Sequence, residues 1–178
     1  MELIGEDCRL DHQYAIFMAR GHVFAGGHAL HNGGVPFDGS QSYQVREGRI
    51  HSGLTVVSFA LSDAPSGAGG FCCIPGSHKS RFPLPEGWDD LEEPTGLVQQ
   101  VPMAAGDALI FTEAITHGCL PWSAAHERRS LLFKYCPGYM QWERNSPFVN
   151  VEAYDWNERQ RKLLRPPYAG RRDPIDVR

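Results

Sequence analysis

The strongest constraint on the fold is that the apolar stretches of this 178-residue chain are short and repeatedly interrupted by turn-forming residues. The chain contains 19 glycines and 13 prolines, spread along its whole length. Because glycine and proline interrupt helices and strands, long helices are not expected. Repeated short strands separated by such turns are typical of β-sandwiches and β-barrels. The sequence therefore predicts an all-β fold.

Five stretches carry the strand signal. They are rich in β-branched, aromatic and aliphatic residues, and several adjoin Pro-Gly or Ala-Gly-Asp turns. In the second of them, LTVVSFAL, larger and smaller side chains alternate, as expected for a strand whose two faces differ. The predicted strands cover residues 14–18, 54–61, 71–74, 108–111 and 130–135.

Helix signal is confined to the region near the C-terminus. Apolar residues occur there among many charged ones, and Asp155 is placed to cap a short helix over residues 156–164. Pro166 would end that helix. Residues 83–96 are acidic and rich in proline and glycine, which predicts a long surface loop. Because no repeat or linker is evident, residues 1–178 are expected to form one domain.

Composition and charge narrow the class of partner. The net charge is -4 and no basic stripe is present, which argues against nucleic acid. The apolar runs are far shorter than the roughly 20 residues that a membrane helix needs. Acidic residues follow Met1 closely, so no signal peptide is expected. The five cysteines are odd in number and form no C-x-x-C pair, which predicts reduced thiols and a cytoplasmic protein.

Two of the eight histidines stand where a metal site would need them. His117 follows the predicted strand at residues 108–111 after a short stretch, and His31 lies between the first two predicted strands. Imidazoles from distant strands can converge inside a barrel, where neutral nitrogen ligands suit iron, zinc, copper or nickel. From residue type and position alone, a structural role for each histidine is the more common outcome.

Two motifs occur in the expected order along the chain. The first is the Gly69-Gly70 turn, a short strand and then Pro-Gly-Ser-His-Lys at residues 75–79. The second is an Ala-Gly-Asp turn, an apolar strand and His117-Gly118, followed by Arg128 at the start of the last predicted strand. Together, these motifs resemble the phytanoyl-CoA dioxygenase family, and the combination is more specific than either motif alone.

The resemblance covers roughly residues 10–140 and implies both a fold and an activity. The fold is a double-stranded β-helix, a jelly roll of the cupin type, here with a short C-terminal helix. The activity is that of an Fe(II)- and 2-oxoglutarate-dependent dioxygenase of the hydroxylase type, acting on a small organic or acyl substrate. Carried onto this sequence, the resemblance makes His31 and His117 the catalytic metal ligands and Arg128 the residue that binds the far carboxylate of 2-oxoglutarate.

Arginine suits this role because its planar fork pairs with a carboxylate through two hydrogen bonds. Strand alternation places Arg128 on the same face as Ser130, and Arg129 on the opposite face. The alternative for Arg128 is a surface ion pair with Glu127 or Asp107.

The sequence departs from the family at the first ligand motif. In the family, the iron-binding His is followed two residues later by Asp, but Gly33 stands there in this chain and cannot bind a metal. One explanation is a two-histidine site completed by water or by a loop carboxylate such as Asp38. A second is a halogenase-like site, in which halide fills the vacant position. A third is a degenerate, non-catalytic metal- or ligand-binding protein, because losing an anionic ligand weakens metal binding.

Two further expectations concern chemistry and assembly. A cupin-type hydrolase or isomerase using zinc would not need Arg128. The chain has few residues before its first predicted strand compared with the family, so it is expected to be shortened at the N-terminus. A sheet left uncovered in this way would favour a homodimer.

Overall fold

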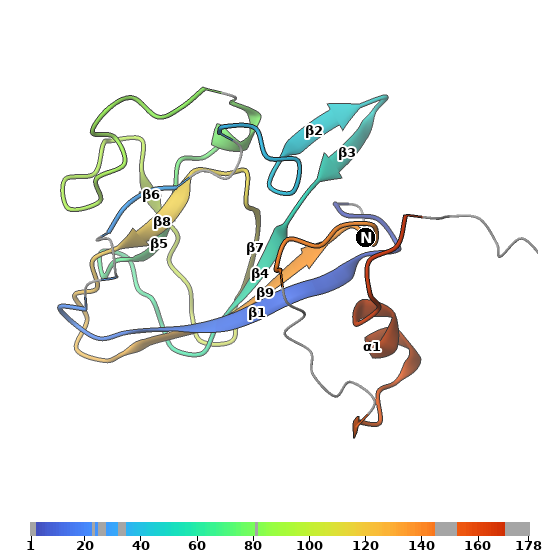
Figure 1. The fold of residues 1–178 in the computed structure, drawn as a ribbon. Helices are drawn as coiled ribbons and strands as arrows, with labels where there is room; N and C mark the ends of the chain where they lie inside the picture. Colours follow the sequence, from blue (N-terminus) through green and yellow to red (C-terminus); the bar gives the residue numbers. More distant parts are fainter. Residues whose placement is uncertain are drawn as a thin grey trace, which may run out of the picture.

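The computed structural model describes residues 3–22, 24, 28–31, 35–80, 82–144 and 153–169. Within these residues, short β-strands dominate and helices are brief (Figure 1). The strands are β1 (Arg9–Met18), β2 (Tyr43–Arg46), β3 (Arg49–Ser52), β4 (Thr55–Ala60), β5 (Gly70–Cys73), β6 (Gln99–Gln100), β7 (Ala108–Thr112), β8 (His117–Leu120) and β9 (Arg128–Cys136). The helices are the 3-10 turn η1 (Ser77–Lys79) and α1 (Glu158–Leu163).

The strands form two main antiparallel sheets. One sheet has the order β1-β9-β4-β7, and the other has the order β6-β5-β8. Phe71 of β5 contacts Phe111 of β7 with ring centroids 4.7 Å apart, so the two sheets pack against each other. The β2–β3 hairpin projects away from both sheets (Figure 1). The fold is the predicted all-β double-stranded β-helix.

All five predicted strands are present, although their bounds differ. The largest change is in β1, which begins at Arg9 rather than at residue 14 and pairs along its length with β9. Strands β2, β6 and β8 were not predicted. The sequence of β8, His-Gly-Cys-Leu, has little intrinsic strand preference, and the strand forms because it pairs with β5.

The short C-terminal helix is confirmed, but its predicted cap is wrong. The side chain of Asn157, not that of Asp155, accepts a hydrogen bond from the backbone N–H of Gln160, and the Gln160 side chain accepts one in return from Asn157. This reciprocal pair is a capping box. Asp155 instead forms a surface ion pair with Arg161. No helix in the described part of the chain is long and apolar enough to cross a membrane.

The loop predicted at residues 83–96 contributes to the core. Most of it lies on the surface, but Leu91 is buried and packs with Leu30 and Cys72. The backbone N–H of Leu30 donates to the carbonyl of Asp89. The loop therefore holds the segment that carries His31.

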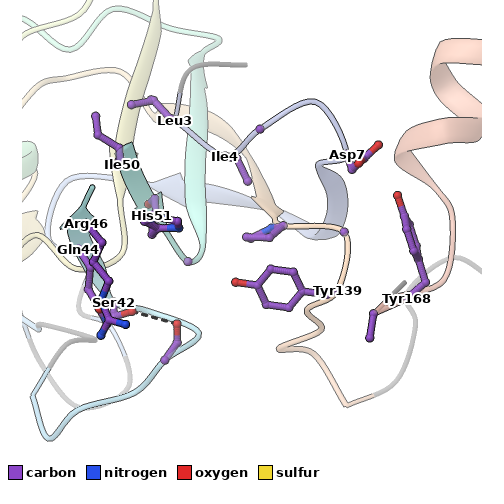
Figure 2. A pocket seen from close by; sticks show the side chains of 17 residues that line it. Leu3, Ile4, Asp7, Ser42, Gln44, Arg46, Ile50, His51, Tyr139 and Tyr168 are labelled. Carbon is purple, nitrogen blue, oxygen red and sulfur yellow. Dashed lines mark hydrogen bonds between the residues drawn. The ribbon is translucent and has the colours of Figure 1, made fainter. Parts of the chain in front are cut away.

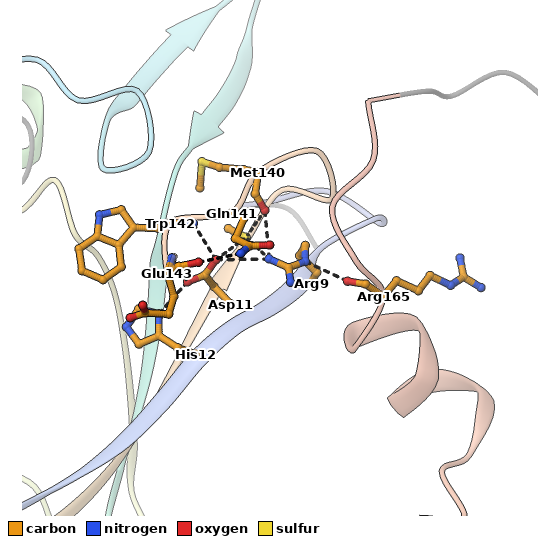
Figure 3. A network of polar contacts seen from close by, with 9 residues as sticks. Arg9, Asp11, His12, Met140, Gln141, Trp142, Glu143 and Arg165 are labelled. Carbon is orange, nitrogen blue, oxygen red and sulfur yellow. Dashed lines mark hydrogen bonds and ion pairs between the residues drawn. The ribbon is translucent and has the colours of Figure 1, made fainter. Parts of the chain in front are cut away.

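Asp11 of β1 is the centre of a buried polar network (Figure 3). It accepts hydrogen bonds from His12 Nδ1 at 2.7 Å and from the backbone N–H groups of Trp142 and Glu143 at 2.9 and 3.1 Å. The Arg9 guanidinium lies 3.3 Å away. Burial pushes the pKa of Asp11 upward, but these hydrogen bonds outweigh burial and hold the pKa below 3.8. The ionised carboxylate thus fastens the segment after β9 to β1.

We expect Asp11→Asn to lower the free energy of unfolding by about 2–4 kcal/mol near pH 7, because it leaves buried donors and the Arg9 charge without their partner. The carboxylate's contribution is present above pH 3.8 and is lost as the pH falls through the lower folded-state pKa. Urea unfolding at several pH values measures both effects. Asp155→Asn, which removes an exposed carboxylate, is the control and should change little; equal stability of the two variants would contradict the prediction.

Candidate metal and cosubstrate site

His31, Glu113 and His117 converge at one point inside the fold. One possible ligand atom from each side chain lies within 4.8 Å of those of the other two. Glu113 follows the last residue of β7, and His117 is the first residue of β8. His31 lies beside β8, where backbone hydrogen bonds of 2.9 and 3.0 Å join it to His117 in both directions. The two imidazole rings have centroids 4.1 Å apart.

Both imidazoles are held in the neutral form that metals require. Burial, and after it the neighbouring His31, lowers the pKa of His117 to about 4. Its Nδ1 lies 2.7 Å from the carbonyl oxygen of Ile115, so the proton belongs on Nδ1 and the lone pair of Nε2 is free. His31 keeps contact with solvent, yet the packing around its ring desolvates it enough to lower its pKa as well.

Glu113 supplies the negative charge of the cluster. Its backbone N–H donates to the carbonyl of Leu54, which fixes the turn after β7. Its carboxylate is buried, and Oε1 lies 2.9 Å from the ammonium of Lys134. Burial alone would lower the pKa of Lys134, but Glu113 and Tyr14 together outweigh burial and raise that pKa. The pair is therefore an ion pair beside two neutral histidines.

Sequence reasoning missed Glu113. The available signal was an acid four residues before His117, in an otherwise uncharged stretch. Asp38, the carboxylate considered as a replacement, accepts hydrogen bonds from the backbone and side chain of Ser40 and is not part of the cluster. Gly33 lies outside the described residues.

Arg128 is buried at the start of β9 and faces the interior. Its side-chain contacts within hydrogen-bonding range are sulfur atoms, with Nη1 3.2 Å from Met18 Sδ and 3.8 Å from Cys119 Sγ. The predicted surface alternative is wrong, because Glu127 pairs with Arg129 at 2.8 Å instead. Among the described residues, no carboxylate forms an ion pair with Arg128. A buried guanidinium without a carboxylate is a favourable place for an anionic ligand.

One cavity joins the buried arginine to the histidines. It has a volume of about 250 Å³, and Arg128, His31 and His117 all line it. Most of its remaining wall is apolar, including Phe71 and Phe111. Pockets for drug-sized ligands are typically about 300–1,000 Å³, so this cavity suits a smaller molecule. Its groups favour a small anion that also reaches the histidine cluster.

A second and larger cavity of about 400 Å³ lies elsewhere, between the β2–β3 hairpin and the chain segments near the two termini (Figure 2). His51, Tyr139 and Tyr168 are among the residues that line it. This larger cavity is lined neither by the three residues of the metal cluster nor by Arg128. The chemistry of the candidate site is therefore confined to the smaller cavity.

These features define a class: a double-stranded β-helix with a His-carboxylate-His cluster and an interior arginine. The sequence pattern of the family described as phytanoyl-CoA dioxygenase (PhyH) matches residues 6–130. The chain therefore belongs to the phytanoyl-CoA dioxygenase family, whose members are Fe(II)/2-oxoglutarate oxygenases. Among curated proteins, none matches this sequence.

Solved structures with the same fold include HygX from Streptomyces hygroscopicus. The form with nickel and 2-oxoglutarate bound has a TM-score of 0.68 and 23% identity, over 79% of this chain and 60% of HygX. The form with iron bound has a TM-score of 0.69 and 24% identity, over 79% of this chain and 62% of HygX. A nickel complex of the non-haem monooxygenase ThoJ has a TM-score of 0.51 and 19% identity, over 76% of this chain and 46% of ThoJ. The chain thus spans about 60% of the length of HygX.

Gly70 allows Arg128 to lie where it does. Its φ is +83°, and a Cβ at this position would lie 3.0 Å from both Cδ and Nε of the Arg128 side chain. Gly67 has a similar φ of +80° but nothing within 4 Å of an added Cβ. Both glycines therefore adopt a positive φ, but only at Gly70 would an added Cβ crowd the Arg128 side chain.

We expect Gly67→Ala to destabilise the fold by about 1 kcal/mol through backbone strain, and Gly70→Ala to cost about 1–2 kcal/mol more because Arg128 must shift. Thermal and urea unfolding of both variants measure the difference. If the two substitutions cost the same, the close approach of Arg128 to Gly70 is not a constraint.

Proposed function

We propose that the protein is an Fe(II)- and 2-oxoglutarate-dependent dioxygenase of the hydroxylase type, with His31, Glu113 and His117 as its metal ligands. The observation that carries this proposal is the convergence of two neutral imidazoles and one carboxylate within 4.8 Å. Two histidines and one carboxylate are the ligand set of non-haem Fe(II) oxygenases, which leave the other coordination positions open. In such a site, each of the three groups would bind the ion at a distance of about 2.0–2.2 Å.

The proposed cosubstrate follows from Arg128. Its guanidinium and the histidine cluster line the same cavity, so a small dicarboxylate can reach both. The similar HygX structure with nickel and 2-oxoglutarate supports this choice of ligand. When bound, iron and 2-oxoglutarate supply the oxidising chemistry: dioxygen is consumed, one oxygen atom enters the substrate, and 2-oxoglutarate becomes succinate and carbon dioxide.

The protein's own groups prepare the site. The Ile115 carbonyl holds His117 in one tautomer and directs Nε2 toward the other ligands. Glu113 contributes the negative charge that stabilises a bound dication. Arg128 orients the cosubstrate, and the aromatic walls of Phe71 and Phe111 limit the access of water.

Glu113 also bears on the competing explanations. The halogenase-like and the degenerate sites both start from the missing carboxylate at Gly33, and Glu113 supplies a carboxylate from the turn after β7. A zinc hydrolase would leave the buried Arg128 without a purpose. We therefore favour the hydroxylase, acting on a small organic or acyl molecule. One HygX structure has hygromycin B bound, so a protein of this fold can hold a small organic molecule. The free thiols of all five cysteines suit a cytoplasmic protein.

His117→Ala should abolish succinate formation that depends on both Fe(II) and 2-oxoglutarate, because it removes a ligand that no neighbour replaces. Glu113→Gln should lower Fe(II) affinity at least tenfold, because it removes the only negative ligand. Anaerobic titration with Fe(II) and 2-oxoglutarate, followed by the visible absorption of the chelate, and succinate analysis after adding air measure both effects. His51→Ala, an exposed histidine outside the cluster, is the control. Unchanged succinate formation by His117→Ala would refute the proposed metal site.

Arg128→Met should weaken 2-oxoglutarate binding at least thirtyfold while leaving metal affinity within about threefold, because the charge pair with the far carboxylate is lost and the metal ligands are not. Calorimetry with Fe(II) or Co(II), and then with 2-oxoglutarate, separates the two steps. Arg129→Met, on the opposite face of β9, is the matched control and should bind both normally. Wild-type affinity of Arg128→Met for 2-oxoglutarate would exclude this residue as the clamp.

A further inference from the structure

A second cation lies inside the barrel at the far end of β9. Lys134 is on the same face of β9 as Arg128, because their positions differ by six and strand side chains alternate. Its side chain is 11% exposed, and that of Glu113 is 6% exposed. The 2.9 Å contact between Lys134 Nζ and Glu113 Oε1 is thus a buried ion pair, and it involves the only carboxylate of the metal cluster.

Two aromatic rings also lie close to the ammonium of Lys134. Its Nζ lies 5.3 Å from the ring centroid of Tyr14 and 5.9 Å from that of Trp142. The ring of His12 stacks on Trp142, and His12 is itself fixed by Asp11. Aromatic faces attract cations, so Lys134 is stabilised beside the cluster by groups other than Glu113.

The pair changes the charge that a metal ion meets. With two neutral histidines and Glu113 alone, the cluster would carry one negative charge. With Lys134 paired to Glu113, the four groups together are neutral, and the ammonium repels an incoming dication. Without Lys134, however, the metal-free protein would bury an unpaired carboxylate, which is strongly unfavourable.

We propose that Lys134 is a built-in counter-cation of the metal site. It holds Glu113 in place in the metal-free protein and competes with the metal for that carboxylate. Lys134 is a positioning residue, because it acts through Glu113 and is not itself a ligand. The proposal rests on the proposed function in one respect: His31, Glu113 and His117 must bind a divalent metal.

The test is the metal affinity of variants that keep or remove the charge at residue 134. The probe is Co(II), titrated without 2-oxoglutarate at pH 7.5 and followed by calorimetry and by visible absorption. Lys134→Met should bind Co(II) at least tenfold more tightly than the wild type, and its metal-free form should melt at a lower temperature. Lys134→Arg, which keeps the charge, should stay near wild-type affinity. Arg129→Met removes a cation from the outer face of the same strand and should change neither property.

A gain in affinity separates this role from a merely structural one, because damage to the fold weakens metal binding. Lys134→Gln, which keeps a polar partner for Glu113 without the charge, provides a second neutral variant if Lys134→Met does not fold. If the wild type binds Co(II) in a His117-dependent manner but neither neutral variant binds more tightly, the inference about Lys134 is wrong and the metal site stands. If neither the wild type nor the neutral variants bind Co(II), the proposed metal site fails together with this inference.

Discussion

The pairing of β9 with β1 on one side and β4 on the other is the constraint on which the interior depends. It holds β9 in the middle of the larger sheet, so alternate side chains of this strand must point into the barrel. Arg128 and Lys134 lie on that inner face, roughly 20 Å apart along the strand at about 3.3 Å per residue. Strand β9 thus places one positively charged side chain near each end of the interior.

The two buried cations have different partners, and this makes the two ends of the interior electrostatically different. Lys134 has a carboxylate partner in Glu113 and aromatic rings around it. Arg128 faces sulfur atoms and an apolar cavity. Buried charges are normally paired; Lys134 has such a partner, whereas no carboxylate of the described residues pairs with Arg128, which supports the proposed binding of an anion there. A dicarboxylate that also reaches the histidines is the ligand that this asymmetry favours.

In the proposed metal site, the carboxylate comes from a different part of the sequence than in the His-x-Asp pattern. The His-x-Asp pattern draws two ligands from one short segment, whereas here the acid follows β7 and lies beside a histidine from β8 and another from a distant segment. What the metal requires is the position of the ligand atoms, and that position is accessible from more than one strand end. Gly33 therefore does not by itself indicate a lost site.

Local patterns in the sequence determined the features that repeat every two residues or follow a turn. They include the all-β class, the five main strands, the C-terminal helix and the inward face of Arg128. The tertiary structure decided that Glu113 joins His31 and His117, that Lys134 neutralises it, and that Leu91 anchors the segment before His31. The physical reason is range: alternation and turn chemistry act between neighbours in the chain, whereas the meeting of strand ends depends on hydrogen-bonded pairing and burial between residues far apart in sequence.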